Sequence, residues 1–316
     1  MDSISIIIPV KNAGKYIKKC LDSIQQLDYP SSLIDVIVVD NGSIDETMKI
    51  VKEYPYQTIV NTTANISQLR NIGTTKANGT YLAFVDADCI VSKSWLTEAV
   101  RLLQDEKIGA VGCWHQLPVN ATFIEKVWDA HTGLRRNVTG PIDWIPTASL
   151  IIKKEIFEKV SGFDENLVTS EDVNICNKII KLGKIVYSHP KLAPIHLRNP
   201  KNSLEFFKKE KWRGEGVIQQ SIQEFPKFNN AILFAIYEMI CLVSMTVCLI
   251  MRQGNNFLLF FLLSFLPVIV LAVKAVIKSR KYFYFIPLVY LFYLYGISRA
   301  CSFLNLNLWK LNSKLK

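Results

Sequence analysis

The chain has 316 residues, half of which are hydrophobic, and a formal net charge of +10. The length allows one large domain or two smaller ones, and the long apolar runs after about residue 225 exclude a uniformly soluble protein. The basic residues form no arginine-rich arm and show no stacking-aromatic pattern. We therefore expect no nucleic-acid partner and assign the charge to anionic lipid and a phosphorylated substrate. Seven cysteines without a Cys-x-x-Cys pair predict free thiols in a reducing compartment.

Strand-like apolar runs alternate with helical spacings through the first two thirds of the chain. The expected strands are 3–10, 35–40, 58–60, 81–85, 108–113 and 144–152. The expected helices are 16–26, a segment ending near residue 54, 64–78, 95–104, 154–160 and 171–182. This alternation predicts a parallel, doubly wound α/β sheet, in which ligands lie at the carboxyl ends of strands. Asp40 and Asp86 both fall at such ends.

Two carboxylates separated by one residue end the apolar run that begins at Tyr81. Asp86 and Asp88 point the same way if the segment is extended, so they can converge on one hard cation, which prefers oxygen ligands. A divalent ion held there would neutralise a diphosphate as it leaves. Because aspartate is also common in turns, this pattern alone leaves open an acidic turn without chemistry.

Two other turns carry acids at expected helix starts. Ser43 followed by Glu46 has the spacing of a capping box. Glu171 and Asp172 lie in a first helical turn, where the helix dipole favours negative charge. Simple capping would explain the second pair, so a catalytic role for it depends on the other motifs.

The order of six short motifs resembles that of family 2 glycosyltransferases of GT-A fold. The motifs are Ile8-Pro9-Val10-Lys11-Asn12, Val39-Asp40-Asn41-Gly42-Ser43-Ile44-Asp45, Arg70-Asn71-Ile72-Gly73, Asp86-Ala87-Asp88, Gly162-Phe163-Asp164-Glu165 and Ser170-Glu171-Asp172. The resemblance covers roughly residues 3 to 200 and rests on the shared order, since each motif alone is weak. It implies a Rossmann-like, mixed but mainly parallel sheet flanked by helices.

The resemblance also implies roles for individual residues. Asp40 matches the acid that reads the nucleotide base, and Asp172 matches the general base, with Glu171 as its neighbour. Asp88, together with Asp86, matches the pair that binds a divalent cation, Mg²⁺ or Mn²⁺. His196 stands where some GT-A enzymes have a histidine near the metal, although a structural or phosphate-facing histidine stays open. The nucleotide-sugar side comprises Pro9, Lys11, Asn12, Asp40, Asn41, Gly42, Arg70 and Asp86.

These residues suit direct displacement with inversion at the transferred sugar. A metal ion neutralises the leaving nucleoside diphosphate, and a carboxylate activates the acceptor hydroxyl. The chain departs from processive polysaccharide synthases, because the region of their Gln-x-x-Arg-Trp motif reads Lys209-Glu210-Lys211-Trp212-Arg213-Gly214-Glu215-Gly216. Trp212 and Arg213 fit contacts to the acceptor or the diphosphate, and equally an anchor at a membrane surface.

Three apolar runs follow, at 231–251, 257–273 and 282–298, and each is near the roughly 20 residues that a bilayer span requires. The segment before them, 204–226, mixes aromatic residues with lysines, as helices on a bilayer surface do. If all three runs cross and the catalytic domain is cytoplasmic, the last lysines lie outside, against the positive-inside rule. The sequence therefore leaves open whether two or three runs cross.

We expect four regions along the chain: a GT-A catalytic domain at 1–200, an amphipathic interfacial segment at 201–230, a membrane region at 231–305 and a basic tail at 306–316. The expected function is transfer of a single sugar from a UDP- or GDP-sugar to a lipid-linked or surface-polysaccharide acceptor. The expected location is the cell membrane, multi-pass, with the catalytic domain in the cytoplasm. A processive synthase and a catalytically inactive membrane scaffold of the same fold remain the alternatives.

Overall fold

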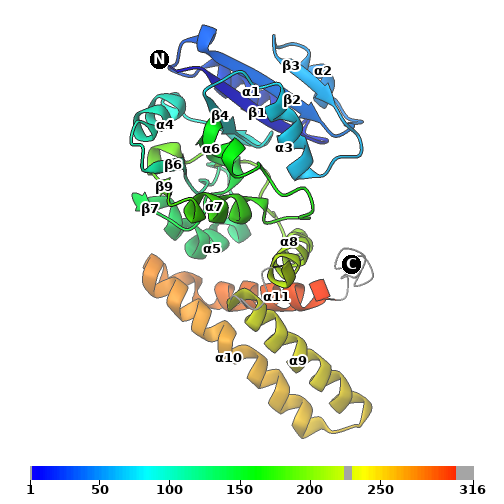
Figure 1. Ribbon diagram of the computed structural model, residues 1–316. Helices are drawn as coiled ribbons and strands as arrows, with labels where there is room; N and C mark the ends of the chain where they lie inside the picture. The colour runs from blue at the N-terminus through cyan, green and yellow to red at the C-terminus, as the bar shows by residue number, and fades with distance from the viewer. Residues whose placement is uncertain (1, 224–229, 304–316) are drawn as a thin grey trace. The chain divides into compact units, whose positions relative to one another are not determined.

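The computed structural model describes residues 2–223 and 230–303, so the expected basic tail lies outside the described residues (Figure 1). The chain forms two compact units. The first consists of residues 1–121, 132–166 and 171–199. The second consists of residues 122–131, 167–170 and 200–316. The second unit therefore takes one helix and one short segment from within the stretch expected to be catalytic.

An eight-stranded sheet organises the first unit, in the order β3-β2-β1-β4-β8-β6-β9-β7. The strands are β1 (Ile4–Val10), β2 (Ile34–Asp40), β3 (Gln57–Val60), β4 (Tyr81–Phe84), β6 (Ile108–Gly112), β7 (Gly140–Pro141), β8 (Leu150–Lys153) and β9 (Ile185–Ser188). β3, β2, β1 and β4 are parallel, whereas β8 runs antiparallel to both β4 and β6. The mixed, mainly parallel sheet implied by the resemblance is confirmed.

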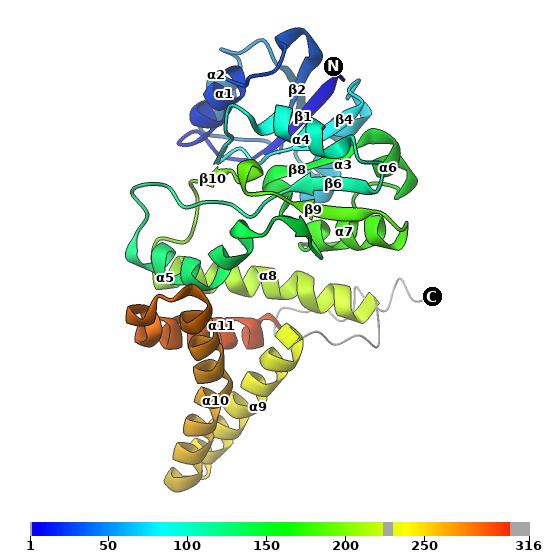
Figure 2. The ribbon, with the colours of Figure 1, turned by 90° about the vertical axis from the view of Figure 1, so that its left-hand side faces the viewer.

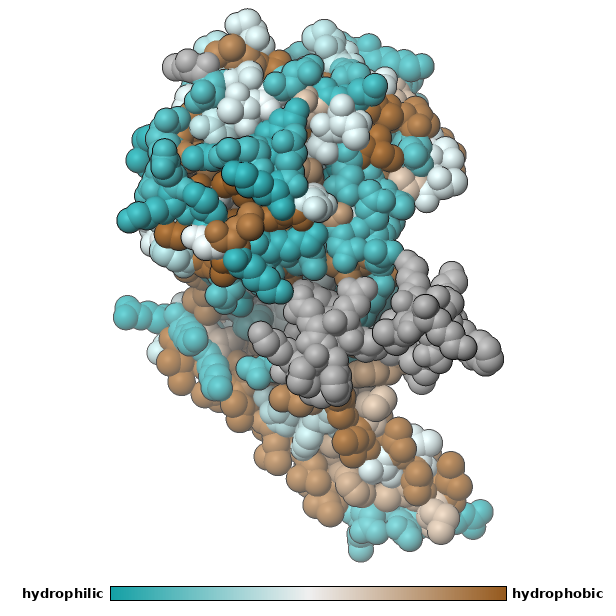
Figure 3. All heavy atoms as spheres, viewed as in Figure 1, coloured by the Kyte–Doolittle hydropathy of each residue, from teal (hydrophilic) through white to brown (hydrophobic). Residues whose placement is uncertain are grey.

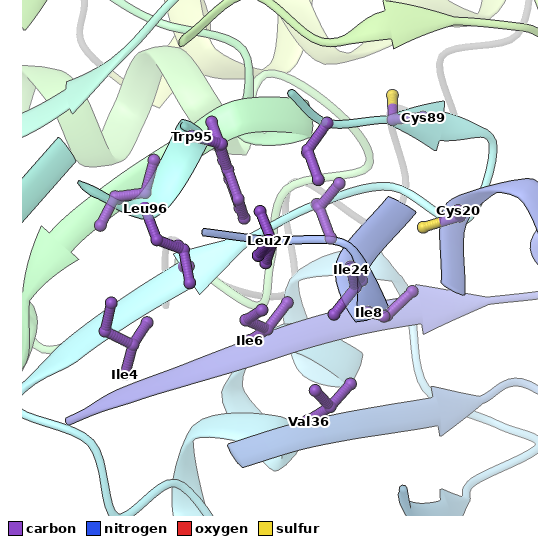
Figure 4. Packing of buried hydrophobic residues seen from close by; sticks show 14 of the residues in the cluster. Ile4, Ile6, Ile8, Cys20, Ile24, Leu27, Val36, Cys89, Trp95 and Leu96 are labelled. Carbon is purple, nitrogen blue, oxygen red and sulfur yellow. The ribbon is translucent and has the colours of Figure 1, made fainter. Parts of the chain in front are cut away.

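Helices cover both faces of this sheet because successive strand residues point to opposite sides. Ile6 and Ile8 pack with α1 (Ile17–Gln25) and α4 (Trp95–Leu103), as Figure 4 shows. Ile7 packs in a second cluster with residues from three other helices. These are α3 (Ile66–Thr75), α6 (Lys154–Lys159) and α7 (Glu171–Lys181). Gly73 lets α3 approach closely, since a Cβ there would lie 2.5 Å from the Ile7 side chain.

Three details of the expected elements were wrong. Residues 144–152 form no continuous strand, because a 3-10 turn at Thr147–Ser149 follows Pro146 and β8 begins only after it. The helix expected to end near residue 54 is the shorter α2 (Thr47–Val51). The capping box at Ser43 and Glu46 is absent: Glu46 is the N-cap of α2 without a side-chain hydrogen bond, and the Ser43 hydroxyl donates to Asp40. β9 forms at residues where no strand was expected.

The second unit is helical. Its helices are α5 (Phe123–Thr132), α8 (Ser203–Gln223), α9 (Asn230–Ile250), α10 (Gly254–Ser279) and α11 (Phe285–Ser302). α9, α10 and the segment Tyr282–Ser302 are long and apolar enough to cross a membrane. Hydrophobic side chains cover the surface of α9 and α10 in Figure 3. Within this unit α9 and α10 form a hairpin, and α11 lies across it (Figures 1 and 2).

Candidate active site

The turn after β2 is held by the side chain of Asp40. Its carboxylate accepts hydrogen bonds from the backbone N–H groups of Gly42 and Ser43 at 3.0–3.1 Å and from the Ser43 hydroxyl at 2.5 Å. Asp40 is only 2% exposed. Gly42 has φ +71°, and a Cβ there would lie 2.8 Å from Thr62. The carboxylate of Asp40, the residue expected to read the base, therefore stabilises this turn through its hydrogen bonds.

The loop after β1 is tied to the same turn. Lys11 Nζ donates to Asn41 Oδ1 at 2.7 Å, and the Asn41 amide donates to two carbonyl oxygens of the loop after β3. Asn12, with φ 49°, accepts from Ile44 N and donates its own N–H to Ser43 Oγ. Pro9 lies in β1 opposite Val39 of β2. The structure thus brings the expected nucleotide-side residues of β1 and β2 together in one hydrogen-bonded group.

Arg70 links two acids that are far apart in the sequence. From α3, Nη2 contacts Asp86 Oδ1 at 2.9 Å and Nη1 contacts Glu171 Oε1 at 2.7 Å. The arginine side chain is 3% exposed, Glu171 is 11% exposed and Asp86 is 32% exposed. Burial lowers the pKa of Arg70, but the two carboxylates outweigh burial, and the net shift is upward. Arg70 is therefore a permanent cation that fixes both acids.

Asn71, the next residue on α3, holds the loop that leads towards α7. Its amide donates to Phe163 O and to Glu165 Oε1 at 2.9 Å each, and its oxygen accepts from Phe163 N at 3.1 Å. The Phe163 ring lies 5.7 Å from the Arg70 guanidinium. Through Arg70 and Asn71, α3 therefore contacts both the first residue of α7 and the Gly-Phe-Asp-Glu loop before it.

A second group forms where β5 (Cys89–Ile90) pairs with β10 (Ile195–His196). This pairing places His196 Nε2 3.5 Å from Asp88 Oδ1. The Cys89 thiol lies 3.8 Å from the same oxygen, and ligand atoms of all three residues lie within 4.8 Å of one another. The His115 ring is 5.0 Å from the His196 ring. Oxygen, nitrogen and sulfur donors thus converge at Asp88, two residues after Asp86 in the chain.

Glu171 and Asp172 open α7 and have different surroundings. The Glu171 carboxylate is committed to Arg70, as described above. Asp172 is partly exposed, and its Oδ1 accepts from the N–H of Val173 at 2.8 Å. Ser170, just before them, has φ 68°, a left-handed conformation that sets the direction of the helix start. The two neighbouring acids therefore differ in role: Glu171 forms an ion pair with Arg70, whereas Asp172 is partly exposed to solvent.

Trp212 and Arg213 lie on α8 in the second unit. Trp212 is 47% exposed. Arg213 Nη1 donates to Glu210 at 2.7 Å, and Arg299 of α11 donates to the other oxygen of Glu210 at 2.7 Å. Arg213 is thus committed to a buried ion pair within its own unit.

Comparison with known proteins identifies the first unit. Residues 5–161 match the model of the family described as glycosyl transferase family 2. The chain carries a family 2 glycosyltransferase domain. Glycosyltransferase AglE of Haloferax volcanii is 29% identical over 232 residues, which are 68% of this chain and 73% of AglE. Glycosyltransferase GlyA of Streptococcus pneumoniae is 28% identical over 233 residues, but this match spans only 32% of GlyA.

Solved structures show the same fold. Mannosyltransferase PcManGT from Pyrobaculum calidifontis, in complex with GDP-Man and Mn²⁺, has a TM-score of 0.65 at 18% identity, covering 98% of this chain and 88% of that one. A fragment of Staphylococcus aureus TarS in complex with UDP-GlcNAc has a TM-score of 0.51 at 18% identity, covering 74% and 70%. The first unit therefore has the GT-A fold, and three apolar helices long enough to cross a membrane follow it in the chain.

Several residues of the site escaped the sequence analysis. Cys89 and His115 were given no role, and Asn71 was quoted only as part of a motif. Cys89 follows Asp88 directly and could have been noticed. His115 lies in an irregular stretch, and its neighbour His196 is 81 residues away in the chain, so no local pattern pointed to it.

Proposed function

We propose that this protein is a membrane-bound, inverting glycosyltransferase that transfers one sugar from a UDP- or GDP-sugar to a lipid-linked or surface-polysaccharide acceptor. The observation that carries the proposal is the double ion pair of Arg70. It holds Asp86, at the carboxyl end of the central strand β4, in a fixed relation to the start of α7. One buried cation thereby couples the donor-side Asp86 to Glu171, the residue next to the acid that would activate the acceptor.

Asp88 and His196 are the residues that would hold a divalent cation, with Asp86 and Cys89 beside them. A carboxylate oxygen and an imidazole nitrogen 3.5 Å apart fit Mn²⁺ or Mg²⁺, and the nearby thiol adds a softer donor. When bound, such an ion supplies Lewis-acid neutralisation of the leaving diphosphate. The Mn²⁺ and GDP-Man in the PcManGT structure support this proposal by fold similarity.

On the nucleotide side, the paired turns after β1 and β2 would receive the donor. Because the Asp40 carboxylate is buried and accepts from Gly42 and Ser43, we propose that Asp40 positions the turn, which then presents its backbone to the base. Lys11 is held at the same place by Asn41, where its charge would attract the phosphates. Arg70 would act through Asp86, because its own Nη groups are already paired.

Asp172 is the better candidate for the general base. Glu171 is nearly buried and its carboxylate is paired with Arg70, so an acceptor hydroxyl has little access to it. Asp172 is partly exposed, and a carboxylate of this kind can take the proton of an acceptor hydroxyl as the hydroxyl attacks the sugar. A single base opposite the leaving diphosphate gives inversion. For Trp212 and Arg213, contact with the acceptor or diphosphate stays a prediction.

We place the protein in the cell membrane, with the glycosyltransferase domain in the cytoplasm. The three long apolar helices support anchoring by length and composition. All seven cysteines lie among the described residues and none of them forms a disulfide there, which suits a reducing compartment.

Release of nucleoside diphosphate from a panel of nucleotide-sugars tests the function. The full-length protein is assayed in native membranes with Mg²⁺ or Mn²⁺, beside the Asp172→Asn variant prepared in the same way. We expect release with one donor in wild type, a single-sugar product with inverted configuration, and little release in the variant. Products of many sugars would instead indicate a processive synthase. No turnover with any donor, together with no donor binding, would indicate an inactive scaffold.

A further inference from the structure

The segment Tyr282–Ser302 meets the length and hydropathy criteria for a membrane span, but its contacts with other helices indicate that it does not cross. Its mean hydropathy of 1.2 is well below the 2.2 of α9 and the 2.6 of α10. Almost half of it, 44%, is buried inside the protein, compared with 17% for α10. Part of this burial comes from α5 and α8, which precede α9 in the chain, whereas α11 follows α10. If α11 packs along α5 and α8, the chain has returned after α10 to the side from which α9 started.

α11 is bonded to α8 near its middle and near its end. Tyr290 Oη lies 2.9 Å from Ser203 Oγ, near the first residue of α8. Arg299 Nη2 donates to Glu210 at 2.7 Å, and the Ser302 hydroxyl donates to the carbonyl of Lys211 at 2.7 Å. The residue numbers rise together on both helices, so the two helices pack side by side. Gly214 permits the closest approach, since a Cβ there would meet Ser302.

The start of α11 is bonded to α5. Lys281, just before α11, pairs with Asp129 at 3.8 Å. The Phe292 ring packs against Trp128, with centroids 5.4 Å apart, and Trp128 also packs against Phe206 of α8. Contacts from residue 281 to residue 302 therefore lead to α5 and α8, which precede α9, and α11 also packs across α9 and α10, with Tyr295 against Phe234 and Tyr293 against Phe265. These residues would span about 31 Å along a helix axis.

α8 itself cannot lie in the hydrocarbon. It carries seven charged residues within its 21 positions: Glu205, Lys208, Lys209, Glu210, Lys211, Arg213 and Glu215. Charged side chains at membrane depth are costly and rare. If α11 crossed the bilayer, its partners on α8 would have to follow it through the membrane core. A helix tied along its length to a charged helix stays at the surface with that helix.

We propose that only α9 and α10 cross the bilayer, and that α11 lies with α8 at the membrane surface on the side from which α9 enters. α9 with 21 residues and α10 with 26 are each long enough to cross a hydrocarbon core of about 30 Å. Their exposed side chains, among them Val243, Val247, Leu262 and Leu266, suit lipid.

The charges of the chain agree with two crossings. Lys274, Lys278, Arg280 and Lys281 lie at the end of α10 and after it, and Lys310, Lys314 and Lys316 follow α11 in the sequence. Two crossings place both groups on the same side, as the positive-inside rule requires. Three crossings would place the second group on the opposite side. The proposal rests on membrane anchoring and is independent of the sugar and acceptor.

Two tags on the full-length chain test this arrangement in intact cells and in inverted vesicles. One is inserted between Arg252 and Gln253, at the tip of the hairpin, and the other follows Lys316; a tag before Met1 is the reference. We expect the first to be accessible from outside the cell, and the second to be protected together with the reference. A final tag accessible from outside would overturn the proposal. So would a hairpin tag on the reference side, because the hairpin would then not cross.

A matched pair of lysine substitutions gives a second measurement. Leu266→Lys places a charge in the middle of α10, and Tyr290→Lys places one in the middle of the third apolar segment; both side chains are about half exposed. We expect Leu266→Lys to lower the fraction that resists carbonate extraction, and Tyr290→Lys to leave it unchanged. Equal losses in both variants would favour three spans. Extraction of the wild-type chain would refute anchoring itself, which separates that outcome from a wrong topology.

Discussion

Each of the two units buries one charged side chain between two partners of opposite charge. The central charge is positive in the first unit and negative in the second. In the first unit, Arg70 lies between Asp86 and Glu171. In the second unit, Glu210 lies between Arg213 and Arg299. The first group has an excess of one negative charge, and Asp86 remains 32% exposed. The second has an excess of one positive charge, and Glu210 is 2% exposed, although Arg213 reaches the surface.

This difference distinguishes a site from a structural joint. Burying an ion costs free energy that good pairing only partly offsets, so ion pairs are weak evidence for stability by themselves. In the first unit one of the two acids, Asp86, stays partly exposed, two residues before Asp88 of the proposed cation site. In the second unit the central carboxylate is enclosed and joins α8 to α11. Substitutions in the two ion pairs, and in the acids near the first pair, test this distinction.

Asp88→Ala should have the largest effect, because it removes the acid closest to His196. Metal ions contribute several kcal/mol of charge stabilisation to such reactions, so turnover should fall by roughly 10³-fold or more. The fold should survive, since Asp88 is a polar residue at the site. Turnover and Mn²⁺ binding by calorimetry check this, with the exposed Asp28→Ala as the matched control. Full wild-type activity in excess chelator would contradict the metal role.

Asp172→Asn should rank next. Loss of a general base typically costs on the order of 10²–10⁴-fold in rate. Asparagine keeps an oxygen for the N–H of Val173, so the start of α7 should persist. Donor affinity should change little, because Asp40, Asp86 and Asp88 are intact. The paired measurement is kcat and donor Kd; a rate within a few-fold of wild type would return Asp172 to a capping role.

Arg70→Lys should cost less than either acid. Lysine keeps the charge, but its compact ammonium cannot match the two-pronged contact to Asp86 and Glu171. We expect a loss of roughly 10- to 100-fold in turnover, as for other residues that orient site groups. Melting temperature should fall by a few degrees, since one hydrogen bond to a charged group contributes about 1.5–3 kcal/mol. Unchanged kinetics with lowered stability would make Arg70 purely structural.

The sequence predicted what depends on local order and missed what depends on distant contacts. Strand ends near Asp40 and Asp86 follow from apolar runs that any buried strand shows: β2 ends at Asp40, and β4 ends at Phe84, two residues before Asp86. The Arg70–Glu171 pair joins residues 101 positions apart, and no spacing rule connects them. The capping box that the structure contains is Asn65 with Gln68 at α3, whereas Ser43 and Glu46 have the same spacing without forming one.

The membrane region shows the same limit more strongly. A hydropathy window registers that the segment after Tyr282 is apolar, but not whether protein or lipid covers it. Trp128 and Phe206, which cover part of α11, come from α5 and α8 and lie far away in the sequence. Hydropathy therefore predicted three candidate spans, and only side-chain contacts separate the third from the other two.

Glu210→Gln should have the smallest effect and depend on pH. Burial raises the pKa of Glu210, but Arg213 and Arg299 outweigh burial, so its pKa lies below the ordinary 4.5. A lowered pKa in the folded state means that the pair stabilises the fold fully above about pH 4.5. This contribution is lost as the pH falls through the folded-state value. Acid should therefore loosen the contact between α8 and α11.

The measurement is the melting temperature of the full-length protein in detergent at pH 7 and below pH 4. The melting temperature of the wild type should fall between the two pH values. At pH 7 the free energy of unfolding of Glu210→Gln should be about 2 kcal/mol below that of the wild type, which lowers the melting temperature, because an amide accepts from arginine less strongly than a carboxylate. The variant should then lose less on acidification. Glu155→Gln, an exposed acid on α6, is the matched control and should follow wild type. If Glu210→Gln lost as much as wild type, the acid sensitivity would lie elsewhere, and the joint between α8 and α11 would depend on Ser302, Gly214 and the aromatic contacts alone.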